Sequence, residues 1–258
     1  MWKGALVLPS MRVPVKLYAA LQDRTVRFRL LHAEDEQPVV QHMVEPESNE
    51  VVPNEAVQRG FETEDGSFVI VRPDELATIE PEPSRDIEVL RFVPRGSVDL
   101  PWYDRPYWLG PDGDDAEYAA LVRALEETRR EGICRWVMRK KSYVGSVFVR
   151  DGALALVTLH AASEVISAGA LPRPSGREPS SKELKLAKQL VDALEDTFEP
   201  EAYEDEYRTR VLDLIEKKAR GESVEIQRAP RKEAEEASLA EMLEASLGGK
   251  SRKGKRVA

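Results

Sequence analysis

Three consecutive segments near the middle of the chain, 133–139, 142–150 and 153–159, are rich in Val, Tyr, Phe and Trp. Such residues favour strands, and Asp151-Gly152, between the last two segments, is a preferred dipeptide for a two-residue hairpin turn. The segments therefore predict a meander of three antiparallel strands. With 258 residues, 41% of them hydrophobic, the chain is long enough to bury a core around this sheet.

Strand patterns also precede this meander. Segment 25–32 alternates apolar and basic residues, as expected of a strand with one buried and one solvent-facing side. These two sides would carry Val26, Phe28 and Leu30 on one face and Arg27 and Arg29 on the other. Segments 67–71 and 86–93 predict further strands. The expected fold class is therefore mostly β with some α.

A helix is predicted between these strands and the meander. Asp114 is a suitable N-cap, and Glu117 is placed to reach back to it. The apolar residues that follow at helical spacing are Tyr118, Leu121, Val122 and Leu125. Gly132 follows the end of the pattern as a C-terminal signal. One apolar side indicates that this helix packs on the sheet.

Prolines and serines between positions 172 and 180 interrupt all periodicity and mark a boundary. Beyond it, Ser180 and Glu183 form a capping box for a second helix, which Pro200 ends. A third helix is predicted over 201–220, with acids at its start and basic residues at its end. The apolar residues of these two helices include Leu184, Val191, Leu194, Tyr203, Tyr207, Val211 and Leu214. They need a surface to cover, on this chain or on a partner.

Charge is unevenly distributed along the chain. The formal net charge is −9, yet the charged residues of the tail 248–258 are all basic: Lys250, Arg252, Lys253, Lys255 and Arg256. An acidic body therefore carries a basic tail. Just before the tail, one face of a short amphipathic helix is predicted from Leu239, Met242, Leu243 and Leu247. A helix this short is marginal alone, which indicates either a flexible appendage or a peptide that folds on a partner.

Several classes of protein find no support in the sequence. No apolar run is long enough to span a membrane and the N-terminus lacks a signal peptide, so a cytoplasmic protein is expected. Phosphate-binding glycine loops, nucleophile elbows and His-Glu-x-x-His motifs are missing. The single cysteine, Cys134, lies among apolar residues and predicts a buried, inert thiol. We therefore expect no catalytic residues, no metal and no cofactor.

The chain opens with Trp2-Lys3-Gly4, followed by Val13-Pro14-Val15-Lys16-Leu17-Tyr18. Further phrases follow in order at 52–55, 59–62, 87–94, 103–109 and 124–128. Together they resemble the bacterial Ku family, and the order of predicted elements is similar to that family over residues 1–227.

The resemblance implies a Ku-type β-barrel core with a loop bridge in residues 1–170, a helical arm for dimerisation in 171–227, and a short helix with a basic tail in 228–258. Two copies would form a ring around duplex DNA, bind double-strand break ends without regard to sequence, and recruit DNA ligase D for non-homologous end joining at the bacterial nucleoid. The apolar arm residues named above would then cover the partner subunit, and residues 239–247 would bind the ligase. Two points stay open, namely whether a second Ku homologue replaces the identical copy and whether the tail contacts DNA or ligase.

Sequence-independent binding requires contacts to phosphates and sugars, which Lys and Arg provide. The candidate contacts are Lys16, Arg27, Arg29, Arg135, Arg139, Lys140 and Lys141, together with the five basic residues of the tail. Segment 33–50 falls in the implied bridge but contains six acidic residues and no Lys or Arg. His32 and His42 have no cysteine nearby, so no zinc site is expected there. The alternative is a protein-interaction barrel of the same fold with weak or no DNA binding.

Overall fold

The computed structural model of the protein describes residues 2–173 and 176–222. The chain divides into two compact units. The first contains Met1–Arg24 and Phe28–Ala170, and the second contains Thr25–Arg27 and Leu171–Ala258. The candidate site described below lies in the first unit.

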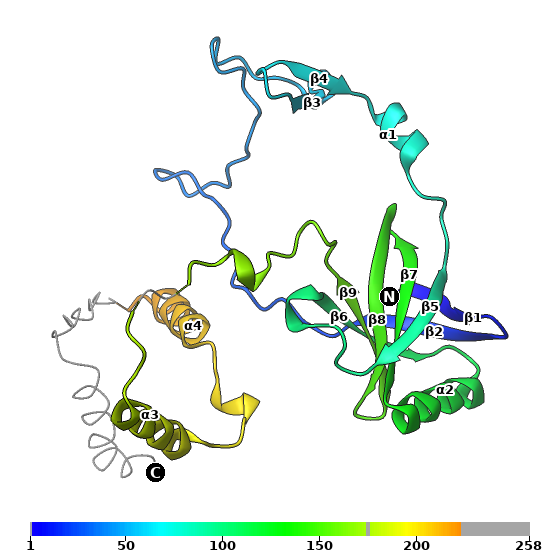
Figure 1. The fold of residues 1–258 in the computed structure, drawn as a ribbon. Helices are drawn as coiled ribbons and strands as arrows, with labels where there is room; N and C mark the ends of the chain where they lie inside the picture. The colour runs from blue at the N-terminus through cyan, green and yellow to red at the C-terminus, as the bar shows by residue number, and fades with distance from the viewer. Residues whose placement is uncertain (1, 174–175, 223–258) are drawn as a thin grey trace. The chain divides into compact units, whose positions relative to one another are not determined.

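Seven strands of the first unit form a closed barrel (Figure 1). Around the barrel they follow the order β1 (Trp2–Leu8), β2 (Met11–Ala19), β6 (Tyr103–Pro111), β9 (Ala153–Leu159), β8 (Lys141–Arg150), β7 (Arg130–Met138) and β5 (Asp86–Pro94). Neighbouring strands are antiparallel except β1 and β5, whose parallel pairing closes the barrel. Closure leaves no strand edge of the barrel unpaired. The expected class, a β-barrel core with helices, is confirmed.

The predicted meander is strands β7, β8 and β9, joined by two-residue turns. Arg139 and Lys140 form the first turn, and Asp151 and Gly152 form the second. All four residues have positive φ, between 52° and 75°, as a type I′ turn requires. The hairpin predicted from Asp151-Gly152 is therefore confirmed. The first turn also has positive φ at both residues but is formed by Arg and Lys, which are not the residues that type I′ turns prefer.

Alternation of side chains along the strands defines the inside of the barrel. In β2, Val13, Val15 and Leu17 are buried and the residues between them face outward. Strand β9 contributes further buried side chains, among them Leu154 and Leu156. Each such side chain stabilises the fold by about 1.5–3 kcal/mol relative to leaving it exposed.

Helix α2 (Asp115–Thr128) completes the core, as predicted. Asp114 accepts a hydrogen bond from the backbone N–H of Glu117, at 3.1 Å. The predicted apolar side packs against β2, β7 and β8, with Leu121, Val122 and Leu125 buried. The C-terminal signal at Gly132 is wrong, because the helix ends at Arg129, which takes the left-handed conformation itself (φ 49°). Gly132 instead lies within β7, where a Cβ would meet the side chain of Val147 at 3.0 Å.

Residues 20–85 form the bridge, the segment by which the chain leaves the barrel after β2 and returns at β5 (Figure 1). It contains β3 (Arg59–Glu62), β4 (Phe68–Val71) and α1 (Pro73–Ile79). The strand predicted over 25–32 is wrong, because that segment is irregular, with Phe28 and Leu30 exposed by 69% and 60%. An alternating pattern favours extended backbone, but a strand also needs a hydrogen-bonded neighbour, and this segment pairs only through an isolated bridge, Leu31 to Pro38.

The second unit contains α3 (Ser181–Leu194) and α4 (Glu206–Ala219). The capping box predicted for α3 is confirmed: the Ser180 side chain accepts from the Glu183 backbone, and Glu183 accepts from the Ser180 N–H at 2.7 Å. Helix α4 begins later than predicted, because Asp205 caps it and Pro200 starts a separate short 3-10 turn. Tyr203 therefore lies outside the helix, stacked on Phe198 at 5.4 Å between ring centroids.

The predicted apolar face of these helices is largely uncovered within the described chain. Val211 is buried, whereas Leu184, Val191, Leu194 and Tyr207 are 48%, 69%, 57% and 75% exposed. The predicted segment 239–247 and the basic tail lie outside the described residues. None of the helices in the described part of the chain is both long and apolar enough to cross a membrane.

Candidate nucleic-acid interface

Two lysines on the outer surface of the barrel share one carboxylate. Lys16 of β2 lies 2.8 Å from Asp112, and Lys3 of β1, its cross-strand partner, lies 3.1 Å from the same residue. The hydrogen bond to Asp112 raises the pKa of Lys16, and hydrogen bonds from Lys16 and then Lys3 lower the pKa of Asp112. Lys16 and Asp112 are thus both charged at neutral pH, and two lysines share this one carboxylate.

Arg135 lies on the outer surface of β7, because its neighbours Cys134 and Trp136 are buried. Its guanidinium lies 2.9 Å from Glu88 of β5, and both side chains are more than half exposed. An exposed ion pair of this kind contributes at most about 1 kcal/mol. Arg135 can therefore exchange Glu88 for a phosphate at little cost.

The β7–β8 turn presents the other predicted cations of the barrel. Lys140 lies 3.0 Å from Glu80, and the ammonium of Lys141 lies 5.5 Å from the ring centroid of Tyr143. Arg139 is exposed and has no acidic partner among the described residues. The structure thus brings three consecutive predicted residues to one corner of the barrel. In the described part of the chain, the charge of Lys140 is paired with a carboxylate, whereas that of Arg139 is not.

Arg27 and Arg29 do not lie on a strand face, since 25–32 is irregular. Both side chains are outside any sheet, and Arg27 belongs to the second compact unit. Their proposed contact with DNA stays a prediction. The tail cations, Lys250 to Arg256, lie outside the described residues.

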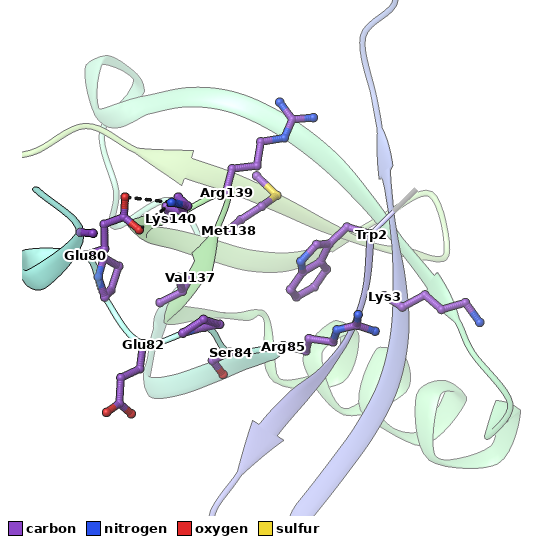
Figure 2. Close-up of a pocket in the computed structure, with 13 residues that line it drawn as sticks. Trp2, Lys3, Glu80, Glu82, Ser84, Arg85, Val137, Met138, Arg139 and Lys140 are labelled. Atoms are coloured by element: carbon purple, nitrogen blue, oxygen red, sulfur yellow. Dashed lines mark hydrogen bonds and ion pairs between the residues drawn. The ribbon is translucent and has the colours of Figure 1, made fainter. Parts of the chain in front are cut away.

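A concave surface lies at the end of the barrel where the bridge leaves β2 and returns to β5. It consists of two recesses, of about 720 Å³ and about 1020 Å³, that share Trp2, Met138 and Arg139. Figure 2 shows the first recess, with the Trp2 indole projecting into it from β1. We call the combined surface the barrel-end groove, and its principal residues are Trp2, Tyr18, Arg85, Arg105, Tyr107, Met138 and Arg139.

Strand alternation explains the floor of this groove. Trp2, Tyr107 and Met138 face the inside of the barrel at its end, so they pack on the core and are only partly buried. The Trp2 ring also occupies the space beside Gly4, where an added Cβ would lie only 2.3 Å from it. The Trp2-Lys3-Gly4 opening therefore has a structural reason, because only glycine leaves room for the indole.

Sequence reasoning missed Arg85 and Arg105 as members of this groove. Arg85 immediately precedes β5, and Arg105 lies in β6 beside Pro106. Nothing in either local pattern indicates that these residues meet Trp2, because their proximity depends on how the barrel closes. Trp2 contributes to the family resemblance in the sequence, but it is not among the predicted site residues.

The acidic part of the bridge is exposed, as its composition predicts. Its two turns are alike, with left-handed Glu36 (φ 56°) and Asn49 (φ 58°) at equivalent positions. A hydrogen bond with His32 lowers the pKa of Asp35, and hydrogen bonds from Ser48 lower the pKa of Glu45. These carboxylates stay ionised and would repel phosphate. Within 2–173 and 176–222, no three His, Cys, Asp or Glu residues lie close enough together to hold a metal ion. Cys134 lies inside the barrel, and burial raises the pKa of its thiol.

The bridge also exposes a large apolar surface that sequence reasoning missed. Strands β3 and β4 form a separate two-stranded sheet. Phe68 and Ile70 lie on one face, 66% and 55% exposed, and Phe61 lies on the other face, 69% exposed. A two-stranded sheet is at best marginally stable by itself. Apolar side chains exposed in this way make the sheet a candidate interaction surface. The signal available in the sequence is the apolar run 68–71, which predicts a strand but not the exposure of its side chains.

Comparison with known proteins places these features in a family. The family model described as the Ku70/Ku80 beta-barrel domain matches residues 7–186. A protein of Geotalea uraniireducens named non-homologous end joining protein Ku 2 is 42% identical, covering 95% of this chain and 96% of its own. A protein of Anaeromyxobacter sp. named non-homologous end joining protein Ku is 38% identical, over 98% of this chain and 86% of its own. A protein of the same name from Mycolicibacterium smegmatis is 33% identical, over 98% of this chain and 82% of its own. The matches extend over the barrel, the bridge and the helices after it, and this chain belongs to the Ku family.

Proposed function

We propose that two copies of this chain bind the ends of broken duplex DNA as a ring-shaped homodimer, without regard to sequence, in repair by non-homologous end joining. The observation that carries the proposal is the similarity to a protein named for that process, over 95% of this chain and 96% of the relative. The proposed role is non-catalytic, since holding a DNA end depends on charge and shape rather than on reacting groups.

The proposed contacts are to the phosphate backbone. Two of the candidate residues lie on the outer surface of barrel strands: Lys16 on β2 and Arg135 on β7. The others lie in or beside the β7–β8 turn: Arg139, Lys140 and Lys141. Phosphate contacts fix position but carry no base identity, as binding at a random break requires. Glu88 and Glu80 would have to release Arg135 and Lys140. The pair of Arg135 with Glu88 is exposed on both sides and is released readily, whereas Glu80 is half-buried.

The proposed partner is a second copy of the chain. Two separate surfaces support it: the apolar residues of β3 and β4 on the bridge, and the exposed apolar face of α3 and α4. Neither has a covering element within its own unit of the described chain. Burial of both in a homodimer would remove from water the side chains that a monomer leaves exposed.

The homodimer can be tested at the bridge. Phe61→Glu with Phe68→Glu places charge on an exposed surface, so the barrel should stay folded while the dimer dissociates. We expect wild type to sediment as two chains and the variant as one, with much weaker binding of linear duplex. The matched control is Leu100→Glu, at a position 82% exposed but outside the bridge. A wild-type monomer that binds DNA would contradict the proposed homodimer. A variant that stays dimeric would exclude β3 and β4 as the essential dimer surface.

We further propose that DNA ligase D binds through Leu239, Met242, Leu243 and Leu247, in the cytoplasm at the nucleoid. The support is the helical spacing of these residues in the sequence. Leu243→Glu with Leu247→Glu should abolish co-precipitation with purified ligase and leave duplex binding intact. Undiminished co-precipitation would refute this part.

Two observations favour the alternative, a protein-interaction barrel of the same fold. Several barrel cations already have acidic partners, and the exposed segment 33–50 carries six acidic residues. In that case the dimer would form but would not retard linear duplex even at low salt. The two functions are therefore separated by one gel experiment on the intact protein.

A further inference from the structure

The barrel-end groove combines aromatic side chains with arginines that have no acidic partner in the described part of the chain. Trp2 and Tyr107 lie on its floor, and Tyr18, 41% exposed, lies along its wall. The exposed arginines are Arg85, Arg105 and Arg139. The acids of the lining are Glu80, Glu82 and Asp23, and Glu80 is already paired with Lys140.

The two hairpin turns of the barrel provide an internal comparison. Both turns have two residues, each with positive φ, but one turn is Asp151-Gly152 and the other Arg139-Lys140. Left-handed backbone costs roughly 1–2 kcal/mol for a residue with a long side chain, and far less for Gly, Asn or Asp. Backbone strain of this kind concentrates at functional sites. The strained turn lies at the groove, and the relaxed turn does not line it.

We propose that the barrel-end groove binds an unpaired strand of DNA, with bases against Trp2, Tyr107 and Tyr18 and phosphates at Arg85, Arg105 and Arg139. Single-strand sites elsewhere use this combination of a cationic groove and aromatic platforms. A base inside a duplex is stacked on both faces and cannot reach an indole, so the ligand is a strand that has separated or an overhang at a break. This inference deepens the proposed function and rests on it for its biological setting.

The groove also has the form that such a strand needs. The two recesses adjoin at Trp2, Met138 and Arg139, with Arg85 lining one and Arg105 the other. A strand that passes over these shared residues would reach both arginines. Figure 2 shows Trp2 and Met138 within the first recess and Arg139 at its rim. A linear polyanion with planar groups can use both the arginines and the aromatic rings of the groove, whereas a compact anion would use one arginine only.

The test uses a short single-stranded oligothymidine and a blunt duplex as separate probes, each measured by fluorescence anisotropy with the full-length protein. Arg85→Gln with Arg105→Gln removes two exposed cations outside the proposed duplex contacts and should leave the fold intact. We expect this variant to bind the oligothymidine about tenfold more weakly or worse, and the blunt duplex as wild type does. The matched control is Arg123→Gln with Arg150→Gln, which removes two exposed arginines from outside the groove.

Each outcome decides a different claim. If wild type does not bind the oligothymidine, or if the Arg85 and Arg105 variant binds it as tightly, the groove is not a single-strand site. Competition by an acidic aromatic peptide as strong as that by the oligothymidine would overturn it too, because the groove would then be a peptide site. Failure of wild type to bind blunt duplex would contradict the proposed function, and the oligothymidine result would still decide the groove.

Discussion

At the scale of single residues, one buried carboxylate organises an end of the barrel. Glu131 of β7 is 1% exposed and accepts hydrogen bonds from Gly96 N–H at 3.1 Å, Tyr103 O–H at 3.1 Å and Ser146 O–H at 2.8 Å. Burial, followed by the charge of Glu131, raises the pKa of Tyr103 to about 12. Tyr103 therefore keeps its proton at neutral pH and stays a donor. The network ties the loop after β5, and strands β6 and β8, to β7.

Replacement of this carboxylate should destabilise the protein. Glu131→Gln puts an NH₂ group where an oxygen now accepts a hydrogen bond, so a buried donor loses its partner, at about 1–3 kcal/mol. Urea unfolding should report this as a lower midpoint. The control, Glu127→Gln, changes a glutamate that is 66% exposed on α2 and should shift stability by less than about 0.5 kcal/mol. A Glu131 variant as stable as the control would show that the network is not structural.

At the scale of elements, the β7–β8 turn predicts a conflict between stability and binding. Arg139→Asn with Lys140→Gly gives the turn its preferred residues and should stabilise the barrel by about 1 kcal/mol. The same change removes two cations, so affinity for DNA should fall. The control is Asp151→Asn in the other turn, which alters neither property appreciably. Thermal unfolding and duplex binding measured on the same samples test this, and a less stable variant would show that the strain argument is wrong.

Local signals were sufficient for much of the fold. The strands of the meander, the cap at Asp114 and the capping box of Ser180 and Glu183 are formed by residues adjacent in sequence, and all are confirmed. The strand over 25–32 failed because alternation specifies the backbone shape but not a pairing partner. The start of α4 was misplaced because an acidic segment offers several possible caps, of which Asp205 is used.

The candidate site was only partly predictable. Lys16, Arg135 and the cations of the β7–β8 turn were selected as exposed strand residues, and the structure places them on the outside of the barrel or at its turn. Their acidic partners were not predicted, because Asp112, Glu88 and Glu80 come from distant parts of the sequence. The barrel-end groove was missed for the same reason: it exists only once the parallel pairing of β1 with β5 has closed the barrel.

At the scale of the whole molecule, an acidic protein is proposed to bind a polyanion, so the basic tail should matter. Removal of residues 248–258 eliminates five cations from a chain of net charge −9. We expect weaker duplex binding and a flatter dependence of affinity on salt, by about one unit of slope for each phosphate that the tail no longer neutralises. Affinity measured over a series of salt concentrations checks this. An unchanged slope would mean that the tail does not bind the DNA backbone.

The central claim is that the homodimer is a ring that must be threaded by a DNA end. The most direct measurement compares linear duplex with a covalently closed circle of the same sequence in a gel at low salt. The ring predicts retardation of the linear form and none of the circle, since a closed circle offers no end. Equal retardation of both forms would contradict the ring, and binding to neither would favour the protein-interaction barrel.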